Sequence, residues 1–362
     1  AADAEGRPTR REFAALAGSA LLSAATPSDV AAAPVPAPAP RDPEDVVLEC
    51  GWALVANDLK DPAPHLVRDA QILVRRGRIE EIRAAKIPGR RRIALPDDVV
   101  LPGFISGHTH VASGTPTRGL IEGGRTYRRP IELVEELGPE DLDALTALNL
   151  AELVRSGCTT QVEMSLSLKQ AESYTRVAKM WGVRGYPGGM IPSTGRLFPI
   201  WYRGGDKELE DSVPDTLKEI EANLAFGLRE MNAADGLIRP MMSPHATDTH
   251  TPETMKALID ASRKLGTGFH FHLSQGARET ATVKRLRGKT PTQWLEELGA
   301  FEVGPFFGAH MAGLDWSVDP EILNRHGVVY AHCPSAGGAG ASMQPFPEAL
   351  SCGMNVNVGI DT

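Results

Sequence analysis

The sequence predicts an α/β protein in which a TIM-type (β/α)8 barrel follows a small β-sandwich domain. From Val99 onward, eight short apolar runs alternate with helical patterns, which is typical of parallel strands joined by helical crossovers. The first run ends in His108-Thr109-His110 and the last delivers Asp361, so both ends of the repeat carry metal-ligand residue types. The segment before Val99 contains short strand-like runs without helices, which predicts the sandwich.

Residues 1–45 are predicted to be an export signal followed by a Pro/Ala tether. The pair Arg10-Arg11 precedes an apolar stretch at 13–25, small residues at 31–33 and a Pro/Ala-rich run at 34–40. Charged, apolar and small residues in this order are typical of a signal peptide, and paired arginines resemble the twin-arginine signal. The apolar stretch is too short for a stable membrane anchor. We therefore expect a periplasmic or extracellular protein; the alternative is a chance Arg-Arg pair before an Ala/Pro-rich tail.

Residues 46–98 are predicted to be the N-terminal part of the β-sandwich. The strand candidates are 46–49, 52–55, 71–74 and a strand that follows the turn at 75–79. The remaining sandwich strands and the last barrel helix are expected to follow Thr362, because the sequence as written stops at the end of a strand.

Residues 99–362 are predicted to form the barrel, truncated after its eighth strand. The strand candidates are 99–106, 158–164, 183–190, 236–242, 267–273, 304–310, 327–332 and 354–360. The helical patterns between them are 138–156, 212–232, 252–265, 319–326 and 345–352. Thr251-Pro252 and Asp319-Pro320 each place a cap residue before a first-turn proline, which marks a helix start. A doubly wound open sheet is the alternative, and the polar strand ends argue against it.

Composition limits the classes of partner. The formal charge of −8 over 362 residues argues against nucleic acid or an anionic membrane, and no basic stripe offsets it. The four cysteines are scattered, without the spacing of a metal site or of a disulfide framework. We therefore expect a small-molecule substrate, no nucleic acid and no stable membrane anchor; a homo-oligomer stays open.

Polar residues stand at the carboxyl ends of the predicted strands, where barrel proteins carry their function. Seven of the ten histidines lie on or near these ends, together with two carboxylates: His108, His110, Glu163, His245, His270, His272, His310, His332 and Asp361. Imidazole nitrogens with a carboxylate oxygen suit Zn²⁺ or Fe²⁺. The fourth strand has no lysine that could bridge two metals as a carbamate, which favours one ion.

The run Leu101-Pro102-Gly103-Phe104 leading into His108-Thr109-His110 resembles the amidohydrolase superfamily. It is most similar to the mononuclear branch that holds cytosine and guanine deaminases, triazine hydrolases and imidazolonepropionase. The resemblance covers roughly residues 46–362. Its supporting stretches are 118–120, 153–160, 270–274, 308–310, 331–335 and 359–361.

The resemblance implies one divalent ion, Zn²⁺ first and Fe²⁺ as the alternative, held by His108, His110, His272 and Asp361. Asp361 would also act as the catalytic proton shuttle, and His310 would hydrogen-bond the water or the oxyanion. His245 and His332 would face the substrate. General chemistry agrees, because a divalent ion makes hydroxide available near neutral pH and a histidine beside a developing oxyanion stabilises it.

Several of these residues have a structural interpretation as well. His270 is more readily a satisfied core histidine than a ligand, and Glu163 could orient a ligand. His65, His250 and His326 are predicted to lie at the surface. In the loop after the third strand, Arg196, Phe198, Trp201 and Tyr202 either line a pocket or pack the loop down.

Gln275 departs from the family pattern, because deaminases of this branch carry glutamate three residues after the fifth-strand histidine. Glutamine offers fixed hydrogen bonds to a substrate but cannot shuttle a proton. The leading hypothesis is therefore a metal-dependent hydrolase that cuts a non-peptide C–N bond of cyclic amide or amidine type. An N-heterocycle deaminase or dehalogenating hydrolase is the second hypothesis. A catalytically silent metal-binding or ligand-binding homologue is the third.

Overall fold

The computed structural model describes residues 45–56, 63–89, 91–114, 128–203, 206–338 and 345–361. The predicted export signal at 1–44 and the motif at 118–120 lie outside the described residues, as do the side chains of Phe198, Trp201 and Tyr202. The chain divides into residues 1–40 and 41–362, and every described element belongs to the second unit. Among the described helices, none combines the length and the apolar composition needed to cross a bilayer.

The N-terminal segment forms a four-stranded sheet in the order β3-β2-β1-β4. Its strands are β1 (Val46–Val55), β2 (His65–Arg75), β3 (Arg78–Arg83) and β4 (Arg91–Val100). The two predicted runs at 46–49 and 52–55 are one strand, because the ladder to β4 shifts register between Cys50 and Trp52 instead of ending. Gly51 lies at this irregularity, where a Cβ would stand 2.4 Å from the Pro96 carbonyl oxygen.

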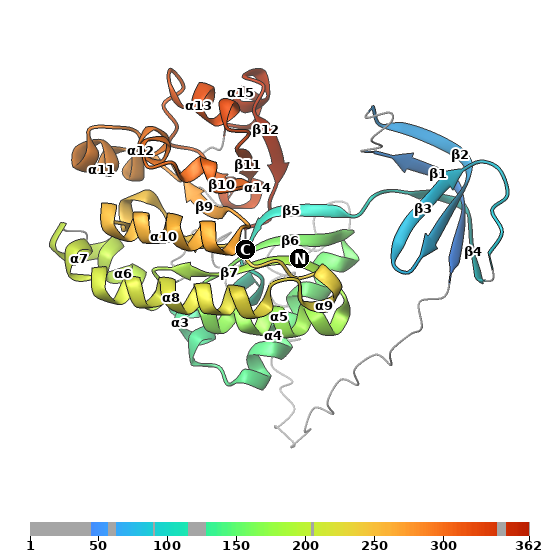
Figure 1. Ribbon diagram of the computed structural model, residues 1–362, viewed down its shortest axis with the longest axis horizontal. Helices are drawn as coiled ribbons and strands as arrows, with labels where there is room; N and C mark the ends of the chain where they lie inside the picture. Colours follow the sequence, from blue (N-terminus) through green and yellow to red (C-terminus); the bar gives the residue numbers. More distant parts are fainter. Residues whose placement is uncertain are drawn as a thin grey trace, which may run out of the picture. The chain divides into compact units, whose positions relative to one another are not determined.

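Eight further strands form two parallel sheets, β5-β6-β7-β8 and β9-β10-β11-β12. They are β5 (Phe104–Thr109), β6 (Cys158–Ser165), β7 (Arg184–Ile191), β8 (Ser243–Pro244), β9 (Phe269–Leu273), β10 (Phe306–His310), β11 (Val329–His332) and β12 (Asn355–Val358). Single bridges join the two sheets, Met242 to Phe269 at one seam and Thr109 to Asp361 at the other. The strands therefore follow chain order around a curled sheet, as Figure 1 shows.

Two strand predictions were wrong in their bounds. Val99 and Val100 end β4 of the first sheet, so the first barrel strand begins only at Phe104. The fourth strand was predicted at 236–242, but only Ser243–Pro244 forms a ladder, with single bridges at Ile238 and Met242. Pro240 lacks the N–H that a continuous ladder needs, which interrupts the strand at this point.

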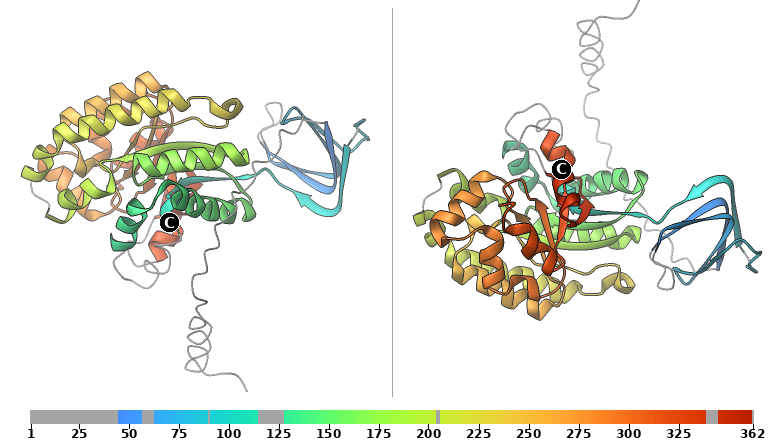
Figure 2. Two further views of the ribbon diagram at one scale, coloured as in Figure 1. Left: turned by 90° about the horizontal axis from the view of Figure 1, so that it is seen from below. Right: turned by 90° about the horizontal axis from the view of Figure 1, so that it is seen from above.

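Helices lie outside the curled sheet (Figures 1 and 2). They are α3 (Arg128–Glu136), α4 (Pro139–Arg155), α5 (Leu168–Trp181), α6 (Thr194–Arg203), α7 (Asp206–Asp211), α8 (Val213–Glu230), α9 (Ala233–Gly236), α10 (Pro252–Leu265), α11 (Ala277–Arg287), α12 (Pro291–Glu297), α13 (Asp319–Arg325), α14 (Pro334–Gly338) and α15 (Phe346–Ser351). Three short 3-10 helices join them: η1 (Val111–Ser113), η2 (Thr247–Thr249) and η3 (Ala300–Glu302).

Helix α10 illustrates how local sequence sets an element. The Thr251 hydroxyl accepts a hydrogen bond from the backbone N–H of Thr254, Pro252 occupies the first turn, and Gly266 ends the helix at φ +75°. Glycine adopts this left-handed conformation without steric cost, so the helix stops where it was predicted to stop.

The largest core cluster packs the second parallel sheet against its helices. Phe269, Phe271 and Phe306 are buried there, and the rings of Phe271 and Phe306 stack with centroids 5.6 Å apart. Because side chains alternate between the two faces of a strand, Phe269 and Phe271 project from the face of β9 opposite that of His270 and His272.

Candidate metal centre

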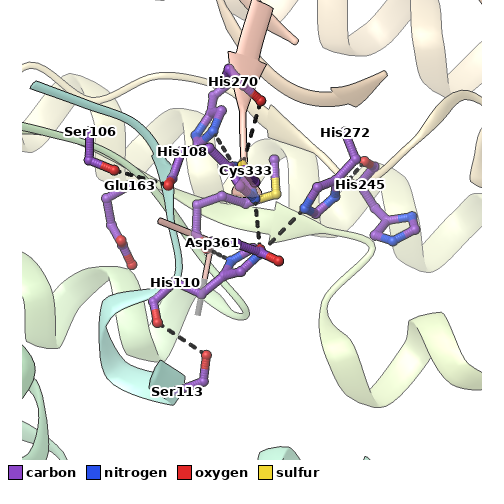
Figure 3. Close-up of polar contacts among 12 residues, drawn as sticks. Ser106, His108, His110, Ser113, Glu163, His245, His270, His272, Cys333 and Asp361 are labelled. Carbon is purple, nitrogen blue, oxygen red and sulfur yellow. Dashed lines mark hydrogen bonds and ion pairs between the residues drawn. The ribbon is translucent and has the colours of Figure 1, made fainter. Parts of the chain in front are cut away.

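Backbone hydrogen bonds at the seam between β5 and β12 bring the two ends of the barrel repeat together. The His110 N–H donates to the Asp361 carbonyl at 2.8 Å, and the Asp361 N–H donates to the His108 carbonyl at 3.1 Å. His272 reaches the same place from β9, at the opposite seam. Figure 3 shows these four side chains converging.

Four ligand-type atoms converge at short distances. Oδ1 of Asp361 lies 3.2 Å from Nε2 of His108 and 3.3 Å from Nε2 of His110. Nε2 of His272 lies 3.4 Å from Nε2 of His110. Around a tetrahedral ion with ligands at about 2.0 to 2.1 Å, ligand atoms stand roughly 3.3 to 3.4 Å apart. These three distances are those expected between ligand atoms of one divalent ion. The ligand atoms of His108, His110 and His272 form one group within 4.8 Å, and those of His108, His310 and Asp361 form another.

The far nitrogen of each ring is engaged, which orients the near one. Nδ1 of His110 donates to the Met164 carbonyl at 2.5 Å, and Nδ1 of His272 donates to the His245 carbonyl at 2.9 Å. Nδ1 of His108 lies 2.7 Å from Nε2 of His270. Partners of this kind fix the tautomer and the ring plane of a ligand, so each Nε2 can point its lone pair at the common centre.

The electrostatics of the site suit a cation. Burial lowers the pKa of His108 to about 3 and that of His272 well below its usual range, so both rings are neutral near pH 7. Burial alone would raise the pKa of Asp361, but hydrogen bonds from His108 and His110 outweigh it and hold this pKa well below its usual range. Against the effect of burial, the hydrogen bond to Asp361 raises the pKa of His110. A divalent ion would displace the protons between these side chains and leave neutral imidazoles and an ionised carboxylate, the protonation states that bind it.

His310 lies at the end of β10 beside this group. Its ligand atom lies within 4.8 Å of those of His108 and Asp361, and its ring stacks on His272 at 5.3 Å. His310 and Asp361 both have a left-handed backbone, with φ of +75° and +63°. This conformation is unfavourable for residues other than glycine and recurs at functional sites.

The three residues that were predicted to face the substrate lie in different surroundings. His245 follows β8 with its ring 5.1 Å from that of His272, and burial lowers its pKa well below the usual range. The ring of His332 lies 4.8 Å from that of Phe346, and its Nδ1 lies 3.2 Å from the Tyr330 hydroxyl. Gln275 follows β9; its backbone N–H donates to Glu279 at 2.7 Å, and its side-chain Oε1 is buried without a partner among the described residues.

The family model of the amidohydrolase family matches residues 99–362. The chain belongs to the amidohydrolase family. The resemblance predicted from the sequence motifs is therefore confirmed, while the roles of individual residues stay predictions.

The curated relatives include two proteins named 5-methylthioadenosine/S-adenosylhomocysteine deaminase. That of Desulfitobacterium hafniense is 32% identical over 275 residues, which is 74% of this chain and 58% of the relative. That of Pelotomaculum thermopropionicum is also 32% identical, over 73% of this chain and 56% of the relative. The chain thus spans less than two thirds of the length of these relatives.

Solved structures confirm the predicted fold class. An adenosine deaminase from Xanthomonas campestris with bound zinc has a TM-score of 0.69 and 23% identity, over 89% of this chain and 70% of the other. Guanine deaminase from C. acetobutylicum gives 0.70 and 18%, over 88% and 74%. An atrazine chlorohydrolase from Arthrobacter aurescens in complex with zinc gives 0.69 and 19%, over 88% and 72%.

His270 is fully buried in contact with His108, which agrees with its interpretation as a buried histidine that is not itself a ligand. One histidine differs from expectation. His250 was predicted at the surface, but only 1% of it is exposed, and its Nε2 lies 3.0 Å from the Ile191 carbonyl. The turn η2 folds this residue back toward β7, a long-range contact that its loop-like sequence does not signal. His65 is exposed, as predicted, and His326 is half-buried beside Glu296.

Glu163 on β6 supports the backbone next to His110. Its carboxylate accepts hydrogen bonds from the Val111 N–H at 3.1 Å and from the Ser165 hydroxyl at 2.7 Å. Burial raises the pKa of Glu163 to about 7. The interpretation of this residue as an orienting group agrees with these contacts.

A cavity of about 280 Å³ borders the centre on the side of α4. His110 and Asp361 line it, together with Thr109, Asn149, Glu152 and Ser335. His108, His272 and His310 do not line it.

Proposed function

We propose that this protein is a metal-dependent hydrolase that cuts a non-peptide C–N bond of a small heterocycle, of cyclic amide or amidine type. The observation that carries the proposal is the approach of imidazole nitrogens of His108, His110 and His272 and a carboxylate oxygen of Asp361, with three distances of 3.2 to 3.4 Å that suit ligands of one ion. Membership of the amidohydrolase family supports the same reaction class.

Asp361, His310 and His245 each have a separate role in the proposed reaction. A divalent ion in this centre would supply Lewis acidity and make hydroxide available near neutral pH. Asp361 is ionised and can accept the proton of the attacking water, then deliver it to the leaving nitrogen. His310 stands beside the ligands, where a neutral imidazole can donate a hydrogen bond to a developing oxyanion. His245 is placed to contact the substrate next to His272.

Gln275 bears on the choice between ring opening and deamination. Amidine deamination benefits from an acid that protonates a ring nitrogen, and an amide side chain has no proton to transfer. Opening a cyclic amide requires only the proton that Asp361 can carry. The buried Oε1 of Gln275 would instead accept a hydrogen bond from a substrate N–H, which a cyclic amide offers.

Deamination of an N-heterocycle is the second candidate. The relatives that are 32% identical carry the name of a nucleoside deaminase, which favours it. The identity of the ion is proposed as Zn²⁺, since the spacing suits tetrahedral coordination; Fe²⁺ is the alternative that metal analysis would detect.

A product screen with the full-length, metal-loaded protein tests the function. The substrates are a panel of cyclic amides, amino-substituted N-heterocycles and chloro-substituted triazines, and the products are ring-opened acid, ammonia and chloride. Ring-opened acid supports the leading proposal. Ammonia alone supports the deaminase, and chloride supports the dehalogenating hydrolase. Stoichiometric binding without any product supports a silent homologue.

Two ligand variants and one surface variant control this screen. His108→Ala and Asp361→Ala remove a ligand each and are expected to abolish turnover, whereas His65→Ala changes an exposed histidine and is expected to leave it unchanged. Full turnover by either ligand variant would refute the proposed mechanism.

We propose further that residues 1–45 direct export through the twin-arginine route, which carries folded and metal-loaded proteins. The support is the order of paired arginines, apolar stretch and small residues in the sequence. Fusion of this segment to a reporter tests it. The reporter is expected to leave the cytoplasm with the native segment and to stay inside when Arg10 and Arg11 are both replaced by lysine.

A further inference from the structure

His270 stands directly behind a proposed metal ligand. It precedes His272 by two residues on β9, so both side chains project from the same face of the strand. His270 is fully buried, its Nε2 lies 2.7 Å from Nδ1 of His108, and the two rings meet edge to face with centroids 4.8 Å apart. Figure 3 shows this contact on the side of His108 that faces away from Asp361.

The contact differs in kind from those behind the other two ligands. His110 and His272 donate to backbone carbonyls, which can only accept, so their tautomers are set by the backbone. The partner of His108 is an imidazole, which accepts or donates according to where its own proton sits.

Only one arrangement leaves His108 able to bind a cation. Nε2 of His108, which faces Asp361 at 3.2 Å, must then be without a proton, so Nδ1 carries the ring's single proton and donates it. Nε2 of His270 must accept a hydrogen bond from that N–H. His270 then carries its own proton on Nδ1, a buried atom that has no hydrogen-bond partner among the described residues. In the opposite arrangement Nε2 of His270 donates, and Nε2 of His108 is protonated and blocked.

We propose that His270 is a positioning residue of the metal centre, holding His108 in the tautomer and ring orientation that bind the ion. The inference rests on the proposed metal site. Nε2 of His270 lies within hydrogen-bond distance of Nδ1 of His108, so His270 is placed for this task. Partners behind a ligating histidine commonly contribute 10- to 100-fold in metal affinity.

Zinc affinity, measured by competition with a chromophoric chelator on the full-length protein, tests the role. His270→Phe keeps a buried planar ring but removes the acceptor, and is expected to weaken zinc binding about 10- to 100-fold. His270→Gln places an amide oxygen near the position of Nε2 and is expected to restore affinity to within a few-fold of the wild type. His250→Phe, at another buried histidine outside the ligand group, is the matched control and is expected to bind zinc like the wild type.

Nitrogen-15 spectra of histidine side chains give an independent readout on the unmodified protein. In the zinc-loaded wild type, His108 and His270 are both expected to carry their protons on Nδ1. A His270 protonated on Nε2 in that state would overturn the inference, as would zinc binding by His270→Phe equal to that of His270→Gln and the wild type. If the wild type itself binds no zinc, the result contradicts the proposed metal site and therefore the proposed function as well as the role of His270.

Discussion

Replacing Glu163 by glutamine is predicted to stabilise the metal-free protein at alkaline pH and not at acid pH. The carboxyl group is fully buried on β6, and burial raises its pKa to about 7, against 4.5 for an unperturbed glutamate. Between these two values the unfolded chain has released the proton while the folded protein retains it. The stability of the wild type therefore falls as the pH rises from about 4.5 to about 7, and changes no further above that through this group.

The size of the stability difference follows from the pH interval between the two pKa values of Glu163. A shift of 2.5 pH units at about 1.4 kcal/mol per unit corresponds to about 3 kcal/mol, which is an upper bound on the ionisation cost. Glutamine resembles the neutral carboxyl group, because its oxygen can accept from the Val111 N–H and its amide can donate to Ser165. We expect Glu163→Gln to match the wild type near pH 5 and to exceed it by up to about 3 kcal/mol at pH 8.

Urea denaturation of the two metal-free proteins at pH 5 and pH 8 measures this difference. Metal must be removed, because a nearby cation would lower the pKa of Glu163 and shrink the effect. Arg176→Gln, at an exposed ion pair, is a control that is expected to show no comparable pH dependence. A gap between Glu163→Gln and wild type that stays constant from pH 5 to pH 8 would refute the reasoning.

Three substitutions and removal of the metal test the site and the core. Asp361→Asn keeps the shape of the side chain but removes its charge, so metal analysis and turnover assays should show weakened metal retention and at least a hundredfold loss of rate, on the order of a lost general base; unchanged turnover would contradict the role. Gln275→Glu supplies an ionisable group and is expected to raise ammonia release from amino-substituted heterocycles relative to ring opening; no change in this ratio would remove Gln275 from the specificity argument. Phe271→Ala deletes a fully buried ring stacked on Phe306 and should cost about 3 to 5 kcal/mol in urea denaturation, with Leu66→Ala at an exposed position as control. Chelation of the ion should lower the melting temperature of the wild type more than that of His108→Ala, because a bound ligand stabilises only the folded state; equal shifts would speak against the metal site.

Much of the site could be predicted because it depends on local pattern. His108 and His110 are two residues apart at the end of an apolar run, so a strand must turn both side chains to one face, and the structure has them there. The carboxyl ends of successive parallel strands meet at one rim of a barrel, so the sequence predicted that His245, His272, His310 and Asp361 lie near one another. In the structure the rings of His245 and His310 both lie beside that of His272.

The predicted bounds of strands and helices were less accurate where an element is short. Helix α10 has cap residues at both ends and was predicted with its observed bounds, but β8 consists of two residues and was misplaced. His250 lies in the turn after β8, and its burial depends on contact with Ile191 on another strand. A loop residue carries no periodicity that would reveal such a contact.

The sequence by itself determined the alternation of strands and helices and the polar character of the strand ends, since both depend on residues close together along the chain. Only the tertiary structure decided which ring nitrogens face one another. His108 meets His270 across 162 residues and Asp361 across 253, and these contacts depend on how the first and last strands meet at the seam. The physical reason is that side-chain torsions decide which ring nitrogen faces the centre, and these torsions depend on packing between distant segments and not on the pattern of residues along the chain.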